Sequence, residues 1–234
     1  MLAAYSSGGY FDGRAIGYDD YAVQEEALRS TFRRVSSGLV RAGYSGGDLL
    51  EIGAGYGFLL DALRPSFRSV MGTEFASEAA TRAQQRGLDV RLGGLDELAG
   101  DLTFDCIVAT HVIEHVYAPR AFIDAVRARL RPGGVVLLGT PDMGSVWRRV
   151  MGPRWPSFKV PEHVLYFDRA HLSQLLRDAG MEDVRSFPFL HSFPVSLILT
   201  KLGMASAGRR LGSVGRIPIP LPATTLALTA RRPA

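Results

Sequence analysis

Short apolar runs alternate with segments whose apolar residues recur every three or four positions between residues 48 and 139. The runs predict buried strands, and the periodic segments predict amphipathic helices. The expected strands are Asp48–Ile52, Ser69–Thr73, Asp89–Leu92, Phe104–Ala109 and Val135–Gly139, and the expected helices are Gly57–Leu63, Ser77–Gln85 and Pro119–Leu130. Strands that alternate with helices pair in parallel through right-handed crossovers, and both faces of their sheet are covered. The pattern therefore predicts a doubly wound α/β fold.

The segments on either side of this alternation are expected to complete a single domain. A helix is expected from Asp19 or Asp20 to about Arg41, a later helix over Arg169–Ala179, and further strands over Met181–Phe187 and Thr224–Thr229. We expect residues 1–47 to form an N-terminal helical cap and residues 48–140 to form the core. Residues 141–168 and 188–222, which interrupt the regular pattern, are the candidate lid or substrate segments.

The composition is that of a soluble globular protein. The chain has 234 residues, of which 47% are hydrophobic and 21% charged. A single cysteine, Cys106, excludes an internal disulfide and a Cys-rich zinc site. Met1–Gly9 lacks the basic start and apolar stretch of a signal peptide, and Pro194 and Lys201 interrupt the longest apolar region, which falls short of the ~20 residues that span a bilayer. We therefore expect a cytoplasmic protein.

Charge is divided unevenly along the chain. Residues 1–147 carry 14 basic and 18 acidic side chains, whereas residues 148–234 carry 13 basic and 5 acidic ones, so the net charge of +4 conceals a basic final third. A positive field of this kind attracts an anionic substrate, an anionic membrane surface or nucleic acid. Nucleic acid is the least favoured of these partners, because the sequence has no compact basic and aromatic stripe and no base-reading motif.

A glycine-rich turn, Glu51-Ile-Gly-Ala-Gly-Tyr-Gly57, follows the first expected strand. Glycine lets a ligand approach the backbone, although any tight turn from a strand to a helix also uses it. Glu74 ends the next strand, where an acid commonly holds the hydroxyls of a ribose. A dinucleotide site prefers its third glycine one residue later, and an acid beside the loop repels a pyrophosphate but pairs with an ammonium group. These features favour S-adenosylmethionine over NAD as the cofactor.

Four motifs together resemble those of the class I S-adenosylmethionine-dependent methyltransferases, in the branch that includes ubiquinone-type O-methyltransferases. They are Glu51-Ile-Gly-Ala-Gly-Tyr-Gly57, Met71-Gly-Thr-Glu74, Phe104-Asp-Cys-Ile-Val-Ala-Thr-His-Val-Ile-Glu-His115 and Leu130-Arg-Pro-Gly-Gly-Val135. Pro161-Glu-His-Val-Leu-Tyr-Phe-Asp168 is also similar to this branch. The resemblance covers roughly residues 48–184 and implies a Rossmann-like sheet of seven strands, mostly parallel, with an antiparallel final strand.

The resemblance implies that residues 48–140 bind S-adenosylmethionine and release S-adenosylhomocysteine. The implied contacts are Glu51, Gly53, Ala54, Gly55, Gly57, Glu74, Phe75, Gly94, Leu95, Thr110 and His111. In this family, the acid and the glycine turn hold the methionine part of the cofactor, and the acid at the end of the second strand takes both ribose hydroxyls. Phe75 would pack on the adenine, although simple packing within the protein is an equal alternative.

One position departs from the family pattern. Many relatives have an aspartate after the glycine that borders the adenine, and this chain has Leu95 after Gly94. Adenine recognition is then expected from backbone groups or from Asp96.

The histidines raise two questions of chemistry. His111-Val-Ile-Glu-His115 spells a zinc-peptidase signature, but that motif needs a long helix, and here it directly follows a buried strand and is soon ended by Pro119. We therefore expect no metal. Methyl transfer to a hydroxyl or an acidic carbon needs a base, and His111 and His163 are the two candidates, while a structural role is the alternative for each.

The remaining candidates rank lower. His171 and His191 are weaker candidates for the base, and Tyr18 and Tyr21 could cap the cofactor or contact the substrate. The leading hypothesis is O-methylation of a small molecule. The alternatives are methylation at nitrogen or carbon of an anionic or membrane-associated acceptor, and a non-catalytic protein that binds S-adenosylmethionine.

Overall fold

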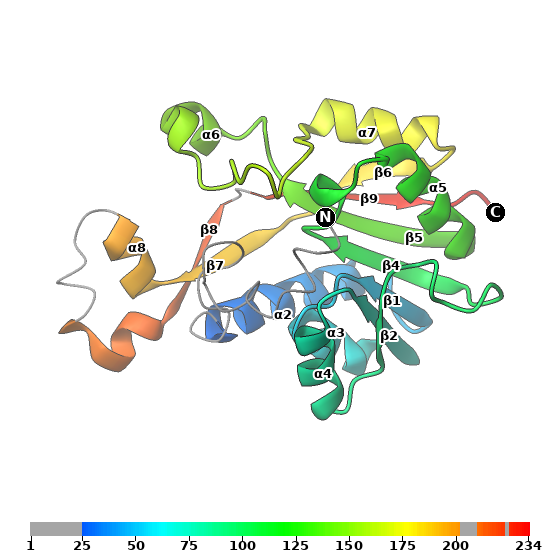
Figure 1. Cartoon of the computed structure of the whole chain (residues 1–234), viewed down its shortest axis with the longest axis horizontal. Coiled ribbons are helices and arrows are strands. Elements are labelled where there is room, and N and C mark those ends of the chain that lie inside the picture. The colour runs from blue at the N-terminus through cyan, green and yellow to red at the C-terminus, as the bar shows by residue number, and fades with distance from the viewer. Residues whose placement is uncertain (1–24, 202–209, 223–224) are drawn as a thin grey trace.

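A seven-stranded sheet in the order β3-β2-β1-β4-β5-β9-β6 runs through the molecule (Figure 1). The computed structural model describes residues 25–201, 210–222 and 225–234. The strands are β1 (Asp48–Ile52), β2 (Ser69–Glu74), β3 (Val90–Leu92), β4 (Phe104–Thr110), β5 (Leu130–Pro141), β6 (Glu182–Ser186) and β9 (Thr225–Arg231). Strands β1 to β5 pair in parallel, and β9 pairs antiparallel with both β5 and β6. The mostly parallel sheet with an antiparallel final strand confirms the predicted fold class.

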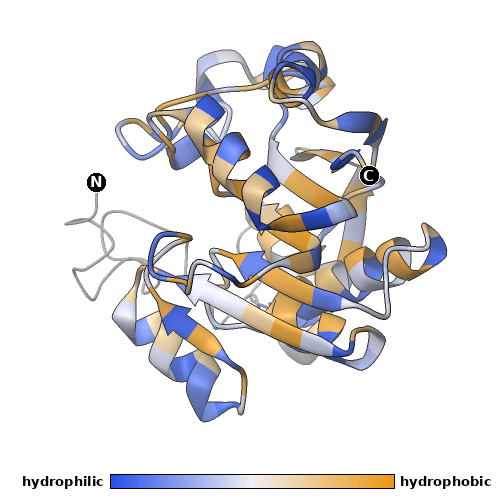
Figure 2. Ribbon diagram, turned by 90° about the vertical axis from the view of Figure 1, so that its right-hand side faces the viewer, coloured by the Kyte–Doolittle hydropathy of each residue, from blue (hydrophilic) through white to orange (hydrophobic). Residues whose placement is uncertain are grey.

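Helices cover both faces of the sheet. They are α2 (Glu25–Arg41), α3 (Phe58–Leu63) and α4 (Ser77–Gln85) on one face, and α5 (Pro119–Arg129) and α7 (Arg169–Asp178) on the other. Successive strand residues point to opposite faces, so Leu49 and Val108 join the first core while Leu50 and Ile107 join the second. The central strands β1, β4, β5 and β9 are therefore buried along most of their length, and Figure 2 shows the hydropathy of the residues along the sheet.

Strand β5 is longer than the sequence predicted. It begins at Leu130, directly after α5, and its pairing with β4 shifts where Phe104 faces Leu130 and Cys106 faces Val135. The intervening sequence Pro132-Gly133-Gly134 is typical of a turn, but in the structure it forms an irregularity within one continuous strand.

The two candidate lid segments contain regular structure that the sequence did not predict. Residues 141–168 contain α6 (Val146–Met151), and residues 188–222 contain β7 (Leu190–Pro194), α8 (Val195–Lys201) and β8 (Pro218–Pro222). Strands β7 and β8 form a separate antiparallel pair that projects from the main sheet (Figure 1). The prolines of β8 occupy alternate positions, so the intervening residues keep their N–H groups for pairing.

Some predictions fall outside the described residues. The expected start of the N-terminal helix and the candidates Tyr18 and Tyr21 lie there, and the described part of this helix begins at Glu25. No helix within the described ranges is long and apolar enough to span a bilayer.

Candidate functional site

The glycine turn connects β1 to α3 at the carboxyl edge of the sheet. Gly53, Gly55 and Gly57 have φ angles of 74°, 54° and 75°. Residues other than glycine rarely adopt such positive φ angles. The N–H groups of Gly53 and Ala54 both donate to the carbonyl of Thr73 at 2.9 Å, which ties the turn to β2. A Cβ on Gly53 would lie 2.7 Å from the side chain of Val112. The turn therefore needs glycine for both its shape and its close packing.

Glu74 joins the turn after β1 to the turn after β2. Its Oε2 accepts a hydrogen bond from the N–H of Gly55, and its Oε1 accepts one from the N–H of Ala76, both at 2.8 Å. The side chain is buried, and burial raises its pKa, although the backbone N–H groups partly oppose this shift. Each carboxylate oxygen keeps a second lone pair for a ligand.

Glu51 lies beside Glu74 and is almost completely buried. Burial, together with the negative charge of Glu74, raises the pKa of Glu51 well above its usual value, and a hydrogen bond from the N–H of Leu60 offsets only part of this shift. Its Oε2 has no hydrogen-bond partner among the described residues. A buried oxygen without a partner is costly, and a positively charged ligand would satisfy it. The two acids therefore favour a cationic ligand such as an ammonium.

Phe75 and Gly94 come together at the ends of β2 and β3. A Cβ on Gly94 would lie 2.8 Å from Cζ of Phe75, so the aromatic ring rests directly over the glycine backbone. Phe75 is 44% exposed, and Leu95 beside it is buried. This exposed ring, fixed over a backbone without a side chain, offers a flat apolar surface to a planar ligand.

An acid that the sequence analysis did not select lies at this position. Both Asp96 and Glu97 are exposed, but it is Oε2 of Glu97 that accepts a hydrogen bond from the N–H of Gly94, at 2.7 Å. The pattern of apolar and polar residues does not predict the contact between Glu97 and Gly94, because this contact depends on the conformation of the irregular loop after β3.

His111 lies directly after β4 with a positive φ of 57°, which is uncommon for a residue other than glycine. Its Nδ1 is 3.1 Å from Oε1 of Glu114, and Oε2 of Glu114 accepts a hydrogen bond from Oγ of Thr140 at 3.0 Å. Because a carboxylate only accepts, Nδ1 donates, and in the neutral ring Nε2 carries the lone pair. That Nε2 is buried and has no hydrogen-bond partner among the described residues.

Glu114 is fully buried, yet it is held in its charged form. Burial would raise its pKa, but the hydrogen bond from His111 and the positive charge that His111 and His115 can carry lower it below the usual value. The carboxylate is therefore a fixed acceptor that sets the orientation of the His111 ring. Thr110, the last residue of β4, is partly buried beside it.

His191 lies near His111, although the sequence analysis ranked it low. It lies two residues after Phe189, and the rings of Phe189 and His111 pack edge to face with their centroids 6.5 Å apart. Burial, together with the charge that His111 can carry, lowers the pKa of His191 to about 3. The sequence gives no signal for the approach of His191 to His111, because β7 was not predicted. His171 is exposed on α7 and pairs with Asp168 at the start of that helix.

His163 lies in the segment between α6 and α7 and packs against His115, with the ring centroids 4.8 Å apart. The Nδ1 of His163 is 2.8 Å from the carbonyl oxygen of Ser157, and burial lowers the pKa of His163 to about 4. The zinc-peptidase signature, residues 111–115, does not lie on an α-helix. Its last three residues, Ile113–His115, form one 3-10 turn. His111 and His115 therefore do not form the helical pair that the peptidase motif needs.

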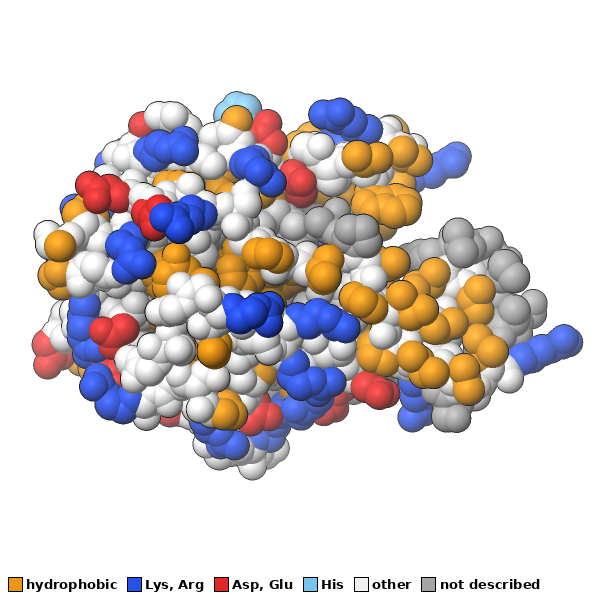
Figure 3. Space-filling model, turned by 180° about the vertical axis from the view of Figure 1, so that it is seen from behind, with side chains coloured by type: hydrophobic (Ala, Val, Ile, Leu, Met, Phe, Trp, Pro, Cys, Tyr) orange, Lys and Arg blue, Asp and Glu red, His pale blue; other side chains and the backbone are white. Residues whose placement is uncertain are grey.

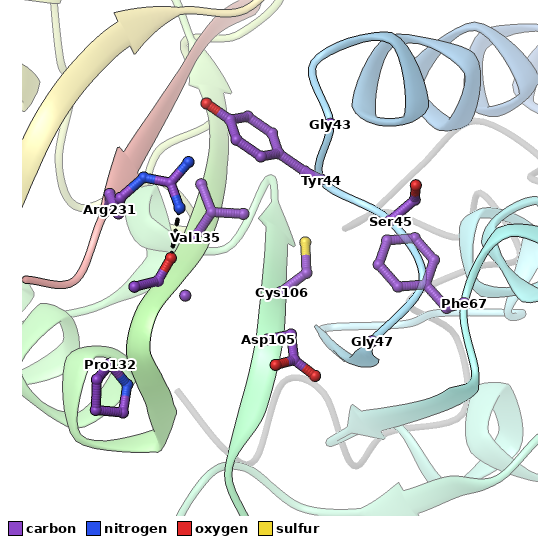
Figure 4. Close-up of a pocket in the computed structure, with 12 residues that line it drawn as sticks. Gly43, Tyr44, Ser45, Gly47, Phe67, Asp105, Cys106, Pro132, Val135 and Arg231 are labelled. Atoms are coloured by element: carbon purple, nitrogen blue, oxygen red, sulfur yellow. Dashed lines mark hydrogen bonds between the residues drawn. The ribbon is translucent and has the colours of Figure 1, made fainter. Parts of the chain in front are cut away.

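A separate pocket opens at the amino-terminal edge of the sheet, opposite the glycine turn (Figure 4). Tyr44, Asp105, Cys106 and Arg231 are among its lining residues, and the guanidinium of Arg231 lies 5.5 Å from the centre of the Tyr44 ring. None of the predicted site residues lines this pocket.

Known proteins resemble this chain over most of the sheet. Residues 25–186 match a family described as a methyltransferase domain. A protein of Mycolicibacterium smegmatis named "Probable S-adenosylmethionine-dependent methyltransferase" is 35% identical over 141 residues, which cover 59% of this chain and 53% of that protein. A ubiquinone biosynthesis O-methyltransferase of Xylella fastidiosa is 29% identical over 160 residues, which cover 62% of this chain and 65% of that protein. The chain thus spans between about half and two thirds of the length of these curated relatives.

Solved structures agree at the level of the fold. Magnesium protoporphyrin IX methyltransferase of Synechocystis, with bound S-adenosylhomocysteine, aligns with a TM-score of 0.65 at 16% identity and covers 99% of this chain and 97% of that one. A SAM-dependent methyltransferase of Archaeoglobus fulgidus aligns with a TM-score of 0.61 at 17% identity and covers 91% of this chain and 100% of that one. The family match, the relatives and the fold show that the chain belongs to the class I S-adenosylmethionine-dependent methyltransferases.

Proposed function

We propose that the protein transfers a methyl group from S-adenosylmethionine to a hydroxyl oxygen of a small molecule. The observation that carries this proposal is the pair formed by His111 and Glu114, which leaves a buried Nε2 lone pair at the carboxyl edge of the sheet. The residues of this edge fit the cofactor, because Glu51 has a buried oxygen without a hydrogen-bond partner among the described residues, and Glu74 lies close enough to act on it electrostatically.

The cofactor would be held by groups from three loops. Glu51 and the turn of Gly53, Ala54, Gly55 and Gly57 would bind the ammonium and carboxylate of its methionine part. Glu74 would accept hydrogen bonds from both ribose hydroxyls. Phe75, Gly94 and Leu95 would border the adenine, and Thr110 with His111 would lie near the sulfonium. When bound, the cofactor supplies an activated methyl group on a sulfonium sulfur.

His111 would act as the base in this reaction. Glu114 accepts the proton-bearing Nδ1 and so fixes Nε2 as the atom that can take a proton from the acceptor hydroxyl. Transfer is then an in-line displacement, and the protein contributes alignment and removal of one proton. Phe189 and His191 would form part of the acceptor wall, because they lie next to His111.

The substitution His111→Ala tests this assignment. It should slow formation of S-adenosylhomocysteine with a panel of hydroxylated compounds by roughly 10²–10⁴-fold, while binding of S-adenosylhomocysteine stays within a few-fold of wild type. His171→Ala, which removes an exposed histidine, is the matched control. Full activity in His111→Ala together with loss of activity in His163→Ala would instead assign the base to His163. Cofactor binding without turnover on any compound would favour a non-catalytic protein.

The surface favours a second candidate, an acceptor carried by an anionic membrane. Helix α6 has no buried residue: Val146 and Val150 are 71% and 73% exposed, and Arg148 and Arg149 lie between them. Hydrophobic side chains also gather on the lobe of β7, β8 and α8, and basic side chains lie near them (Figure 3). Exposed apolar side chains beside arginines suit an interface with anionic lipid. Such an acceptor could be methylated at oxygen, nitrogen or carbon.

Vesicle sedimentation separates this candidate from a freely soluble acceptor. Vesicles that contain phosphatidylglycerol should sediment the protein at low salt, and vesicles of phosphatidylcholine alone should not. Val150→Asp should weaken the binding, whereas Val40→Asp, at an exposed position of α2, should not. Equal binding to both vesicle types, or none, contradicts this candidate.

A further inference from the structure

The pocket at the amino-terminal edge of the sheet has no part in the proposed methyl transfer. It has a volume of about 220 Å³ and is formed by the loop after α2, the first part of β4 and of β5, and the end of β9. A Cβ at Gly43 or at Gly133 would have no atom within 4 Å, so these two walls leave open space. Sites for drug-sized ligands usually have about 300–1,000 Å³, and this pocket therefore suits a smaller molecule.

Arg231 brings a positive charge into this pocket without an acidic partner. Its Nη1 donates a hydrogen bond to the carbonyl oxygen of Gly133 at 2.5 Å, and its guanidinium stacks on the ring of Tyr44. Among the described residues, no carboxylate forms an ion pair with Arg231, and no second acceptor takes its remaining side-chain N–H groups. A guanidinium presents its N–H donors in a fixed fork that matches a carboxylate. The pocket therefore offers a site for one anion.

The acids near the pocket are already paired with other arginines. Oδ2 of Asp105 accepts hydrogen bonds from the N–H of Asp48, at 2.7 Å, and from Nη1 of Arg131. Asp48 in turn pairs with Arg131 at 2.8 Å and with Arg68. Two arginines thus balance two carboxylates, and Arg231 remains as one uncompensated positive charge. A bound monoanion would neutralise it.

Apolar side chains lie beside this arginine. Val135 and Cys106 lie between Arg231 on one side of the pocket and Phe67 on the other (Figure 4). Burial raises the pKa of the Cys106 thiol to about 12, so the thiol is uncharged. Tyr44 and Phe67 are partly buried against the core and add two aromatic rings to the lining. Such rings favour contact with a flat apolar group.

We propose that this pocket binds a small carboxylate whose body is a flat apolar group. The carboxylate would pair with the guanidinium of Arg231, and the flat group would lie over Val135 and Cys106. Strand β4 runs from Cys106 in this pocket to Thr110 at the cofactor edge, and a rise of about 3.3 Å per residue separates them by about 13 Å. The ligand therefore does not touch the cofactor, and both can be bound at the same time.

Calorimetric titration with benzoate tests the chemistry of the site. Benzoate should bind once per chain, with a dissociation constant of roughly 1 mM or lower. Benzamide, in which an uncharged amide replaces the carboxylate, should bind at least about 10-fold more weakly, and so should acetate, which lacks the flat group. Absence of benzoate binding, or equal binding of benzamide or acetate, overturns the proposal.

The substitution Arg231→Gln assigns the binding to this pocket. Glutamine keeps an N–H donor for the carbonyl of Gly133 but removes the charge, so benzoate should bind at least about 10-fold more weakly. Arg185→Gln is the matched control, because Arg185 is an exposed arginine on the neighbouring strand β6. Unchanged affinity in Arg231→Gln, or an equal loss in Arg185→Gln, overturns the proposal.

Nuclear magnetic resonance of the wild type gives a second test that does not depend on the folding of a variant. Benzoate should shift the amide signals of Gly43 and Gly133, which line the pocket, and leave those of Gly53 and Gly55 unchanged. Its affinity should be the same in the presence of saturating S-adenosylhomocysteine. Shifts at Gly53 and Gly55, or displacement of benzoate by S-adenosylhomocysteine, would place benzoate at the cofactor edge and overturn the proposal. None of these readouts depends on methyl transfer, so a failure here is distinct from a failure of the proposed activity.

Discussion

Removal of the Glu74 carboxylate should weaken cofactor binding by about 100-fold. In the proposed site this carboxylate accepts two hydrogen bonds from the ribose, and a hydrogen bond to a charged group contributes about 1.5–3 kcal/mol. The loss of both is about 3–6 kcal/mol, and the lower limit of about 3 kcal/mol already corresponds to a factor of about 150 in the dissociation constant. Isothermal titration of Glu74→Ala with S-adenosylhomocysteine measures this change.

The same substitution also removes a structural contact, so stability must be measured with it. The oxygens of Glu74 accept the N–H groups of Gly55 and Ala76, and loss of such acceptors costs about 1–3 kcal/mol. The raised pKa of Glu74 shows that burial opposes its charge, so we expect a value at the lower end. Thermal unfolding followed by circular dichroism checks that the variant is folded during the titration. Glu78→Ala, at a partly exposed position of α4, is the matched control.

Deoxy analogues of the ligand isolate the ribose contact. The 2′-deoxy and 3′-deoxy forms of S-adenosylhomocysteine should each bind the wild type about 10-fold more weakly than the parent compound, because each lacks one hydroxyl. Folded Glu74→Ala should no longer distinguish these analogues from the parent. The role assigned to Glu74 is refuted if this variant keeps the affinity of the wild type, or keeps the full discrimination between the analogues.

Three further predictions concern ionisation. The pKa of Glu51 is raised, and a cationic ligand binds its deprotonated form, so cofactor binding should release protons and strengthen as pH rises. Calorimetric titration in buffers of different ionisation enthalpy measures this proton release. Equal heats in all buffers would contradict the prediction. Burial raises the pKa of Cys106 to about 12, so the thiol should resist Ellman's reagent at pH 8 until the protein unfolds; rapid reaction of the native protein would refute this. Hydrogen bonds from Arg68 and Arg131 lower the pKa of Asp48. The stabilising effect of the Asp48 carboxylate is therefore present above the unfolded pKa of about 3.9 and is lost as pH falls. Asp48→Asn should lower the resistance to denaturant more at pH 7 than at pH 3, and an equal loss at both values would contradict this.

The alternation of apolar runs and amphipathic helices predicted the central sheet because local patterning determines each of its elements. Strand β1 is predicted with both its limits, since Asp48 and the glycine at position 53 mark them in sequence. The β7–β8 pair was not predicted, because its prolines at 218, 220 and 222 indicate a loop unless the partner strand is known.

The site was predictable only where a motif fixes it. The glycine turn and its acids follow from the strand ends, since parallel strands bring their carboxyl ends to one edge. The contact between Glu114 and His111 depends on a positive φ at His111, and the approach of His163 to His115 depends on how residues 152–167 fold back. Contacts of this kind are set by tertiary packing, so the sequence alone ranks these histidines without showing which of them meet.

The position of β9 has a consequence for the order in which the chain folds. Strand β6 pairs with β9 alone within the described sheet, and β9 separates it from β5. During synthesis, residues 182–186 therefore leave the ribosome about forty residues before the strand that joins them to the sheet. Until then β5 has an open edge, which is a site for pairing with other chains. A nascent chain that stalls before residue 225 should therefore be prone to aggregation, although its glycine turn and both acids are already made.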